Sequence, residues 1–216
     1  MCSTSVMEWV CFQALKHKKE MQNSRILEVG SKNVNGSVKR IIEAAWNPRE
    51  YVGVDIEYGK NVDMVLDVKE ITDRFGFEAF DAVICMEVME HVKEWRPAVI
   101  NLKMVLKTNG ILLLTTRSFG FPYHGYPHDY WRYEVSDMEN IFADMTNEIE
   151  QDSLDKGVFV FARRPPSLEQ QNYDLAPINL YSIANGHRVL GYPEMLNSRK
   201  LFMLLRKLKL ISASLI

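Results

Sequence analysis

The sequence predicts an α/β fold, a doubly wound and mostly parallel seven-stranded sheet with helices on both faces and an antiparallel edge hairpin. Short apolar runs alternate with segments of helical periodicity along residues 25–116, as in a parallel sheet. Polar residues follow these runs, at the sheet edge where ligands bind. Two further runs, 147–150 and 158–162, flank a short turn and predict the hairpin.

The first strand and helix form the unit on which the prediction rests. Residues 26–29, Ile-Leu-Glu-Val, are followed directly by Gly30. In residues 37–46 the apolar side chains recur with the spacing of a helix. Strand, glycine turn and helix open a nucleotide-binding α/β sheet. Gly30 allows a tight turn and close approach of a ligand, and the helix start offers free N–H groups beside it.

Two acids end the next predicted strands. Residues 51–56 contain Asp55, which follows Gly30 by 25 residues, near the spacing at which an acid accepts hydrogen bonds from ribose hydroxyls. A turn-initiating role explains this spacing less well. Residues 62–67 end in Asp67, for which two roles remain open: acceptance from an adenine amino group, or capping of a helix that begins near Lys69.

Residues 80–86 form an almost continuous apolar run, typical of a buried parallel strand. A helix over 94–106 and a strand over 111–116 follow, with 107–110 closing the helix. The carboxyl ends of parallel strands share one edge, so Gly30, Asp55, Asp67, Glu87 and residues 117–118 predict a single site.

The loop 119–133 is rich in aromatic residues and contains two histidines and two prolines. It leaves the strand-end edge directly, which favours a substrate lid over a flap that closes a hydrophobic edge. A helix is expected over 134–143. The chain then divides into a domain over 1–164 and a region over 165–216.

The two ends of the chain are expected to pack on this domain. Residues 1–22 predict an amphipathic helix on its edge, with His17 as a solvated histidine in a charged run. Residues 165–195 predict a wrapped or partly disordered arm. The basic amphipathic helix after residue 197 is expected to pack on the domain, with contact to a membrane surface or a partner as the alternative.

The composition is that of an ordinary globular protein, with 216 residues, 47% of them hydrophobic, and a net charge of −2. The last twenty residues hold five basic residues and no acid, so the remainder is acidic and argues against nucleic-acid binding. Three cysteines without metal-site spacing indicate reduced thiols. With no apolar signal core, a cytoplasmic protein is expected; its oligomeric state stays open.

Four segments together resemble the Rossmann-like (class I) S-adenosylmethionine-dependent methyltransferases, in particular the methyltransferase-11-like group. They are R-I-L-E-V-G, V-G-V-D-I-E, F-D-A-V-I-C-M-E-V-M-E-H-V and L-K-T-N-G-I-L-L-L-T-T, within residues 25–164. The family's Gly-x-Gly-x-Gly motif is incomplete here. Lys32 stands where the family commonly has a glycine, and Gly36 lies further along the chain than the motif predicts. The loop 31–35 is therefore expected to follow a different path.

The resemblance implies S-adenosylmethionine as the cofactor. Glu28 and Gly30 would lie near its methionine part, Asp55 at the ribose, and Asp67 with Val68 at the adenine. The implied cofactor-binding set is Glu28, Gly30, Ser31, Asp55, Ile56, Asp67, Val68, Met86 and Glu87. The acidic strand ends argue against a dinucleotide, whose pyrophosphate they would repel.

Glu87, Glu90 and His91 resemble the Glu-x-x-Glu-His of methyltransferases that act on quinone precursors and small-RNA ends, where it can bind a divalent metal. They would share one face of a helical turn, and His124 or His128 would complete the site. Related enzymes carry Glu-His-Val without metal. We therefore expect no metal, with His91 packed on the sheet and Glu90 solvated.

The predicted reaction is direct displacement of the methyl group by a small-molecule acceptor, such as a sugar, a glycan precursor or another hydroxyl or acid compound. The segment P-H-D-Y-W-R-Y resembles the segment after strand five of many bacterial methyltransferases, some of them from glycan or nucleotide-sugar clusters. If the acceptor needs a base, the histidines His91, His124 and His128 are the candidates, with His91 and His128 as the predicted catalytic residues. The substrate-side candidates are His124, Asp129, Tyr130 and Arg132.

Two other functions are compatible with the sequence. A protein that binds S-adenosylmethionine without catalysis would explain the reduced glycine loop. An RNA methyltransferase guided by the basic tail is the other alternative, and the acidic remainder of the chain argues against it.

Overall fold

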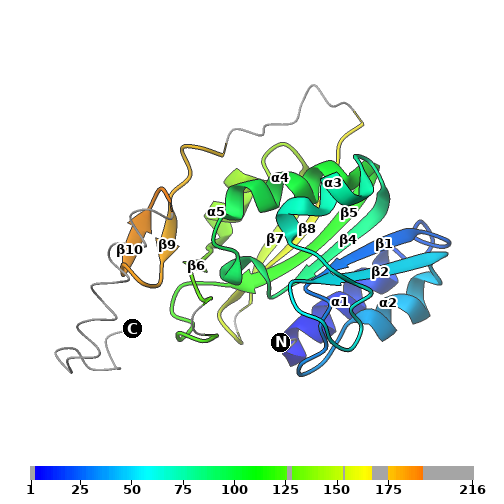
Figure 1. Ribbon diagram of the computed structural model, residues 1–216, viewed down its shortest axis with the longest axis horizontal. Helices are drawn as coiled ribbons and strands as arrows, with labels where there is room; N and C mark the ends of the chain where they lie inside the picture. The colour runs from blue at the N-terminus through cyan, green and yellow to red at the C-terminus, as the bar shows by residue number, and fades with distance from the viewer. Residues whose placement is uncertain (1–2, 126–127, 153, 167–174, 192–216) are drawn as a thin grey trace.

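A computed structural model describes residues 3–125, 128–152, 154–166 and 175–191. Its central sheet has seven strands in the order β3-β2-β1-β4-β5-β8-β7 (Figure 1). The strands are β1 (Arg25–Val29), β2 (Glu50–Asp55), β3 (Met64–Val65), β4 (Phe80–Met86), β5 (Leu106–Arg117), β7 (Thr146–Asp152) and β8 (Gly157–Arg163). β1 to β5 run parallel and β8 runs antiparallel to both neighbours, which confirms the predicted α/β fold and its hairpin.

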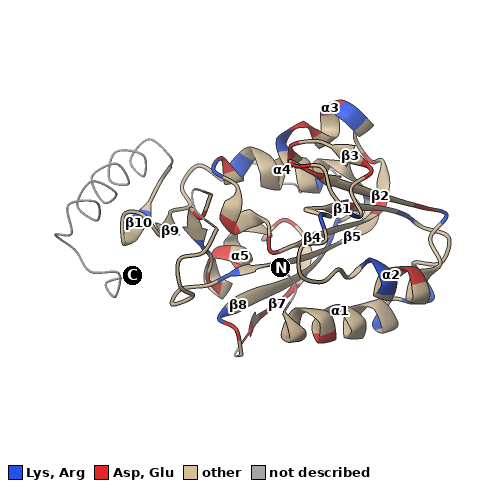
Figure 2. Ribbon diagram, turned by 60° about the horizontal axis from the view of Figure 1, so that its bottom comes forward, with Lys and Arg blue, Asp and Glu red and all other residues tan. Residues whose placement is uncertain are grey.

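Helices cover both faces of the sheet (Figures 1 and 2). One face packs against α1 (Thr4–Lys16) and α2 (Lys39–Trp46). The other face packs against α3 (Ile71–Phe75), α4 (Trp95–Val105) and α5 (Val135–Ile141). Two short 3₁₀ turns, η1 (Val68–Glu70) and η2 (Met89–His91), follow the strand ends near the site.

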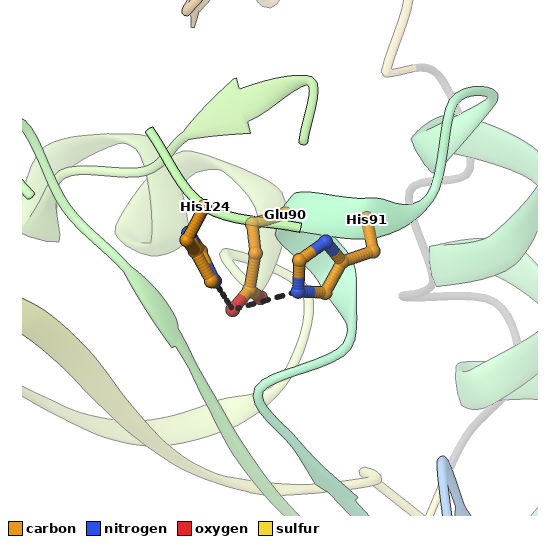
Figure 3. Close-up of side chains that lie close together, drawn as sticks. All are labelled: Glu90, His91 and His124. Carbon is orange, nitrogen blue, oxygen red and sulfur yellow. Dashed lines mark ion pairs between the residues drawn. The ribbon is translucent and has the colours of Figure 1, made fainter. Parts of the chain in front are cut away.

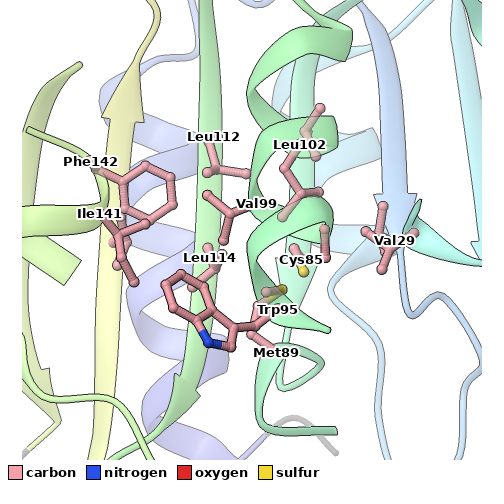
Figure 4. Packing of buried hydrophobic residues seen from close by; sticks show 14 of the residues in the cluster. Val29, Cys85, Met89, Trp95, Val99, Leu102, Leu112, Leu114, Ile141 and Phe142 are labelled. Atoms are coloured by element: carbon pink, nitrogen blue, oxygen red, sulfur yellow. The ribbon is translucent and has the colours of Figure 1, made fainter. Parts of the chain in front are cut away.

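The continuous apolar run of β4 is explained by these two layers. Val83 and Cys85 face the α4 side, whereas Ile84 and Met86 face the α1 and α2 side. Successive side chains of a strand point to opposite faces, so a strand covered on both sides is apolar throughout. On the α4 side, Trp95, Val99 and Leu102 pack over Leu112 and Leu114 of β5 (Figure 4).

β3 and β5 differ most in length from the prediction. β3 comprises only Met64 and Val65 of the expected 62–67, and the side chain of Asp63 just before it accepts a hydrogen bond from the Gly53 N–H. β5 begins at Leu106 rather than at 111. Leu106 pairs with Phe80 and Ile111 with Ala82, so residues 107–110 form an irregularity within the strand instead of ending the helix.

The expectation for His17 is wrong. Its residue exposure is 8%, because it caps the end of α1 and its ring stacks on Phe161 of β8 at 4.6 Å. On the same helix Val6 and Val10 are buried, while Phe12 and Leu15 are exposed.

Residues 175–191 form a small second sheet with the loop after β5. Its strands are β6 (Trp131–Arg132), β9 (Leu180–Ser182) and β10 (His187–Val189), in the order β10-β9-β6. Arg96 of α4 donates hydrogen bonds to the carbonyl oxygens of Leu175, Ile178 and Leu190. The expected C-terminal helix lies outside the described residues. Among the described residues, the helices are too short and too polar to cross a bilayer.

Candidate active site

A cavity of about 530 Å³ opens at the carboxyl ends of β1, β2 and β4. It contains seven of the nine predicted cofactor residues. They are Gly30, Asp55, Ile56, Asp67, Val68, Met86 and Glu87. The parallel sheet therefore brings together residues that are far apart in the sequence, at the edge where such folds bind ligands.

Gly30 turns the chain out of β1 and is required there. Its φ angle is +78°, in the region that favours glycine, and a Cβ atom at this position would lie 2.1 Å from Cγ2 of Val88. Its N–H donates to the carbonyl oxygen of Val54, which ties the turn to β2. The space beside Gly30 is thus filled by Val88, which itself lines the cavity.

Asp55 holds the loop that follows Gly30. Its carboxylate accepts from the backbone N–H of Lys32 at 3.0 Å and of Glu57 at 3.1 Å. The Lys32 ammonium pairs with the Glu57 carboxylate at 2.5 Å. Each carboxylate oxygen of Asp55 keeps a further lone pair for a ligand hydroxyl. The loop therefore uses a lysine and an ion pair where a glycine-rich loop is common.

The capping role of Asp67 is confirmed. Its side chain accepts from the Lys69 N–H at 2.9 Å and caps η1. Asp67 and the next residue, Val68, also line the cavity, so the contact with adenine stays a prediction.

Glu28 and Ser31 lie behind the cavity wall. Ser31 is 2% exposed and its N–H donates to the Val54 carbonyl oxygen. Glu28 accepts a hydrogen bond from the Tyr51 hydroxyl at 2.9 Å. Burial raises the pKa of Glu28 to about 7, an effect that the Tyr51 hydrogen bond and the charge of Lys39 offset only in part.

Glu87 lines the cavity at the end of β4 and is almost fully buried. It forms an ion pair with Arg117, at the end of β5, and the Arg117 guanidinium stacks over the Phe121 ring at 4.1 Å. Burial and the nearby Glu90 carboxylate raise the pKa of Glu87, while Arg117 lowers it. The ion pair fixes the carboxylate beside the predicted position of the cofactor.

The loop after β5 reaches back over the cavity. His91, His128 and Tyr130 all line it. Nδ1 of His91 lies 2.6 Å from the His128 carbonyl oxygen, and Nδ1 of His128 lies 3.1 Å from the Tyr130 hydroxyl. The Tyr130 N–H donates to the Glu90 carbonyl oxygen, which fastens the loop to η2.

Asp129 and Arg132 lie inside the loop and not on the cavity wall. Both are fully buried, and they form a bidentate pair at 2.6 and 2.9 Å. Arg132 also donates to the carbonyl oxygens of Phe121 and Pro122. Burial opposes ionisation of Asp129, but hydrogen bonds from Arg132 and His124 lower its pKa to about 2. This pair holds the loop in place.

The expectation that Glu90 is solvated is wrong. Glu90 is fully buried, and its Oε2 accepts from the Thr116 hydroxyl at 2.7 Å. The shared helical face is not formed, because Glu87 has a φ angle of +56° and only residues 89–91 form a 3₁₀ turn. The side chain of Glu90 points between His91 and His124 (Figure 3).

Several cavity residues were not predicted from the sequence, among them Lys32, Val88 and Lys93. Lys32 and Val88 follow predicted strand ends by three and two residues, so their position along the chain was a usable signal. Lys93 follows η2, and no periodicity in the sequence marks the direction of its side chain.

A family model described as a methyltransferase domain matches residues 6–151, more than half of the chain. The chain belongs to this family, and the predicted class of protein is confirmed. No curated protein matches the chain.

Solved structures of methyltransferases share the fold. The 1,6-didemethyltoxoflavin-N1-methyltransferase of Burkholderia thailandensis, solved with 1,6-didemethyltoxoflavin and S-adenosylhomocysteine, is 13% identical with a TM-score of 0.58, covering 74% of this chain and 78% of that one. The N-methyltransferase NodS of Bradyrhizobium japonicum is 14% identical with a TM-score of 0.56, covering 76% and 99%. A SAM-dependent methyltransferase of Archaeoglobus fulgidus is 13% identical with a TM-score of 0.55, covering 73% and 94%.

Proposed function

We propose that this methyltransferase uses S-adenosylmethionine to methylate a small-molecule acceptor. The observation that carries the proposal is the cavity at the strand ends, which gathers seven of the nine residues predicted to bind the cofactor. Its wall combines apolar side chains such as Met86 and Val68 with the carboxylates of Asp55 and Glu87. An adenosine with a sulfonium group and no phosphate fits this combination of apolar and acidic groups.

When bound, S-adenosylmethionine supplies an activated methyl group for direct displacement. The residues of the chain orient the reactants and exclude water. Asp55 would accept from the ribose hydroxyls with its remaining lone pairs, and the loop 119–133 would cover the acceptor.

Calorimetric titration with S-adenosylhomocysteine tests the cofactor site. We expect micromolar-range binding by the wild type and a loss of about 10- to 100-fold in Asp55→Ala, because a hydrogen bond to a charged group contributes about 1.5–3 kcal/mol. The exposed Asp73 of α3 provides a matched control, since Asp73→Ala removes a carboxylate that does not line the cavity. A wild type that does not bind would favour an interaction protein over an enzyme.

His128 is proposed as the base that takes a proton from the acceptor. It lines the cavity, and with the Tyr130 hydroxyl at Nδ1 its Nε2 is left for the acceptor. We expect His128→Ala to lower turnover by about 100-fold or more while the affinity for S-adenosylhomocysteine stays near that of the wild type. Unchanged turnover with the true acceptor would remove His128 from the mechanism.

A further inference from the structure

Glu90, His91 and His124 converge on one point beside the cavity (Figure 3). Glu90 and His91 belong to η2, whereas His124 belongs to the loop after β5. One ligand-type atom from each residue lies within 4.8 Å of those from the other two. The hydrogen bond from the Tyr130 N–H to the Glu90 carbonyl oxygen holds these two segments together.

The carboxylate at this point has an unused oxygen. Glu90 is fully buried, its Oε2 accepts from Thr116, and its Oε1 has no hydrogen-bond partner among the described residues. Oε1 lies 3.8 Å from Nε2 of His91 and 3.8 Å from Nε2 of His124. Both distances are too long for a hydrogen bond. An unsatisfied carboxylate oxygen in the protein interior is costly unless a bound group completes it.

The partners of the two imidazoles orient their lone pairs toward this oxygen. The His128 carbonyl oxygen, 2.6 Å from Nδ1 of His91, only accepts, so the proton of a neutral His91 is on Nδ1. Nδ1 of His124 makes no hydrogen bond among the described residues, but the nearest charged oxygen is Oδ2 of Asp129 at 3.2 Å, which also only accepts and so favours the proton on this nitrogen. In both rings Nε2 then presents a lone pair to the Glu90 carboxylate. Three electron-pair donors that face one point form an arrangement suited to binding a cation between them.

Contrary to the expectation from the sequence, we propose that Glu90, His91 and His124 bind one divalent first-row transition-metal ion, of the zinc class. Two imidazoles and a carboxylate are ligands that such ions prefer, whereas Mg²⁺ and Ca²⁺ prefer oxygen alone. Bonds of about 2.0–2.2 Å need the three side chains to close by a few tenths of an ångström. His91 and His124 are about one-third exposed, so their rings have room for this movement.

The surroundings of the site match those of metal-binding histidines. Such histidines hold a carboxylate or carbonyl oxygen at the nitrogen that does not bind the metal, as Asp129 and the His128 carbonyl do here. Gly125 also fits against the His91 ring, because a Cβ atom at this position would lie 2.9 Å from Cε1. Glu87 is excluded as a ligand, since its carboxylate pairs with Arg117.

The ion would stand at the acceptor side of the cavity. His91 is both a ligand and a cavity-lining residue, so the coordination positions that three protein ligands leave open would face the space covered by the loop. This placement rests on the proposed function, because it assigns to the ion a polar group of the acceptor. Binding of the ion does not depend on the acceptor and is measured without it.

The test is titration of the metal-free full-length protein with Zn²⁺ by calorimetry, and with Co²⁺ by its visible absorption. We expect one ion per chain. Glu90→Gln and His124→Ala should each weaken metal binding by more than 10- to 100-fold. That range is typical for the loss of a group that only hydrogen-bonds to a metal ligand. His187→Ala is the matched control, because this exposed histidine on β10 is not one of the three ligands and should leave affinity unchanged.

Binding of S-adenosylhomocysteine by the same variants separates this inference from the proposed function. We expect His124→Ala to bind S-adenosylhomocysteine as the wild type does, which also shows that the variant is folded. A wild type that binds S-adenosylhomocysteine but neither Zn²⁺ nor Co²⁺ would overturn the metal site and leave the enzyme assignment standing. Equal losses of metal affinity in His187→Ala and His124→Ala would overturn the metal site as well.

Discussion

At the scale of single residues, burial separates carboxylates that look alike in the sequence. Asp55 and Glu28 both belong to strands that lead to the cavity, and both were predicted to contact the cofactor. Asp55 lines the cavity and is bound by two backbone N–H groups. Glu28 is 4% exposed and has the Tyr51 hydroxyl as its hydrogen-bond donor. Burial therefore raises the pKa of Glu28, and the free-energy cost of burying this carboxyl group depends on pH.

Glu28 makes the folded state less stable as the pH rises. Its pKa is about 7 in the folded protein and 4.5 without burial, so stability falls between these values and the full cost is present above pH 7. A difference of this size corresponds to roughly 3 kcal/mol. We expect Glu28→Gln to match the wild type near pH 4.5 and to be more stable by up to about 3 kcal/mol at pH 8.

Urea unfolding at the two pH values measures this difference. Glu148→Gln serves as the control, because Glu148 is exposed and its ion-pair partner within the described part of the chain is Lys16, on the surface. A gain for Glu28→Gln that is the same at both pH values would contradict the assigned pKa.

At the scale of elements, regular segments were predictable and the loop contacts were not. The strands and the β7–β8 hairpin follow from apolar runs, and Gly30, Asp55 and Asp67 were found because each lies at or just after the end of a strand. Glu90 was misplaced, because the left-handed backbone of Glu87 before η2 replaces the helical turn that would have exposed it. Without a regular period, a sequence does not show where a side chain points.

Asp129 and Arg132 illustrate the same limit. Both were expected to face a substrate, and the structure pairs them inside the loop. Removing one partner of a buried ion pair leaves the other charge unpaired. We therefore expect Arg132→Met to destabilise the protein by about 3–5 kcal/mol. Chemical denaturation measures this loss.

The control for Arg132 is Arg163→Met. Arg163 pairs with Glu20 at 2.8 Å, where the two side chains are 26% and 41% exposed, so its ion pair should contribute about 0–1 kcal/mol. If both variants lose the same free energy of unfolding, the Asp129–Arg132 pair is not what holds the loop.

At the scale of the whole molecule, the chain beyond residue 164 takes part in the main hydrophobic core. Leu175, Leu180 and Val189 are at most 3% exposed and belong to the cluster beneath α4 and α5. The sequence placed these residues in an arm, because they are scattered among polar residues and prolines without strand-like spacing. Their burial depends on β6 and Arg96, which are distant in the sequence.

The β9–β10 hairpin should therefore contribute to the stability of the methyltransferase domain. We expect a chain of residues 1–164 to be less stable than one of residues 1–191 by at least about 3 kcal/mol, since each fully buried Leu or Val contributes about 1.5–3 kcal/mol. Comparing these two chains isolates residues 165–191, because both lack the last 25 residues of the sequence. Thermal unfolding monitored by circular dichroism provides the measurement.

Arg96 links this effect to a single side chain. In the 1–191 chain, Arg96→Met removes the donors to the carbonyl oxygens of Leu175, Ile178 and Leu190. The substitution should therefore lower the free energy of unfolding by part of the amount that the deletion of residues 165–191 lowers it. In the 1–164 chain those oxygens are absent, so the same substitution should change stability much less. Equal effects of Arg96→Met in both chains would mean that the β9–β10 hairpin is held by its apolar side chains and not by Arg96.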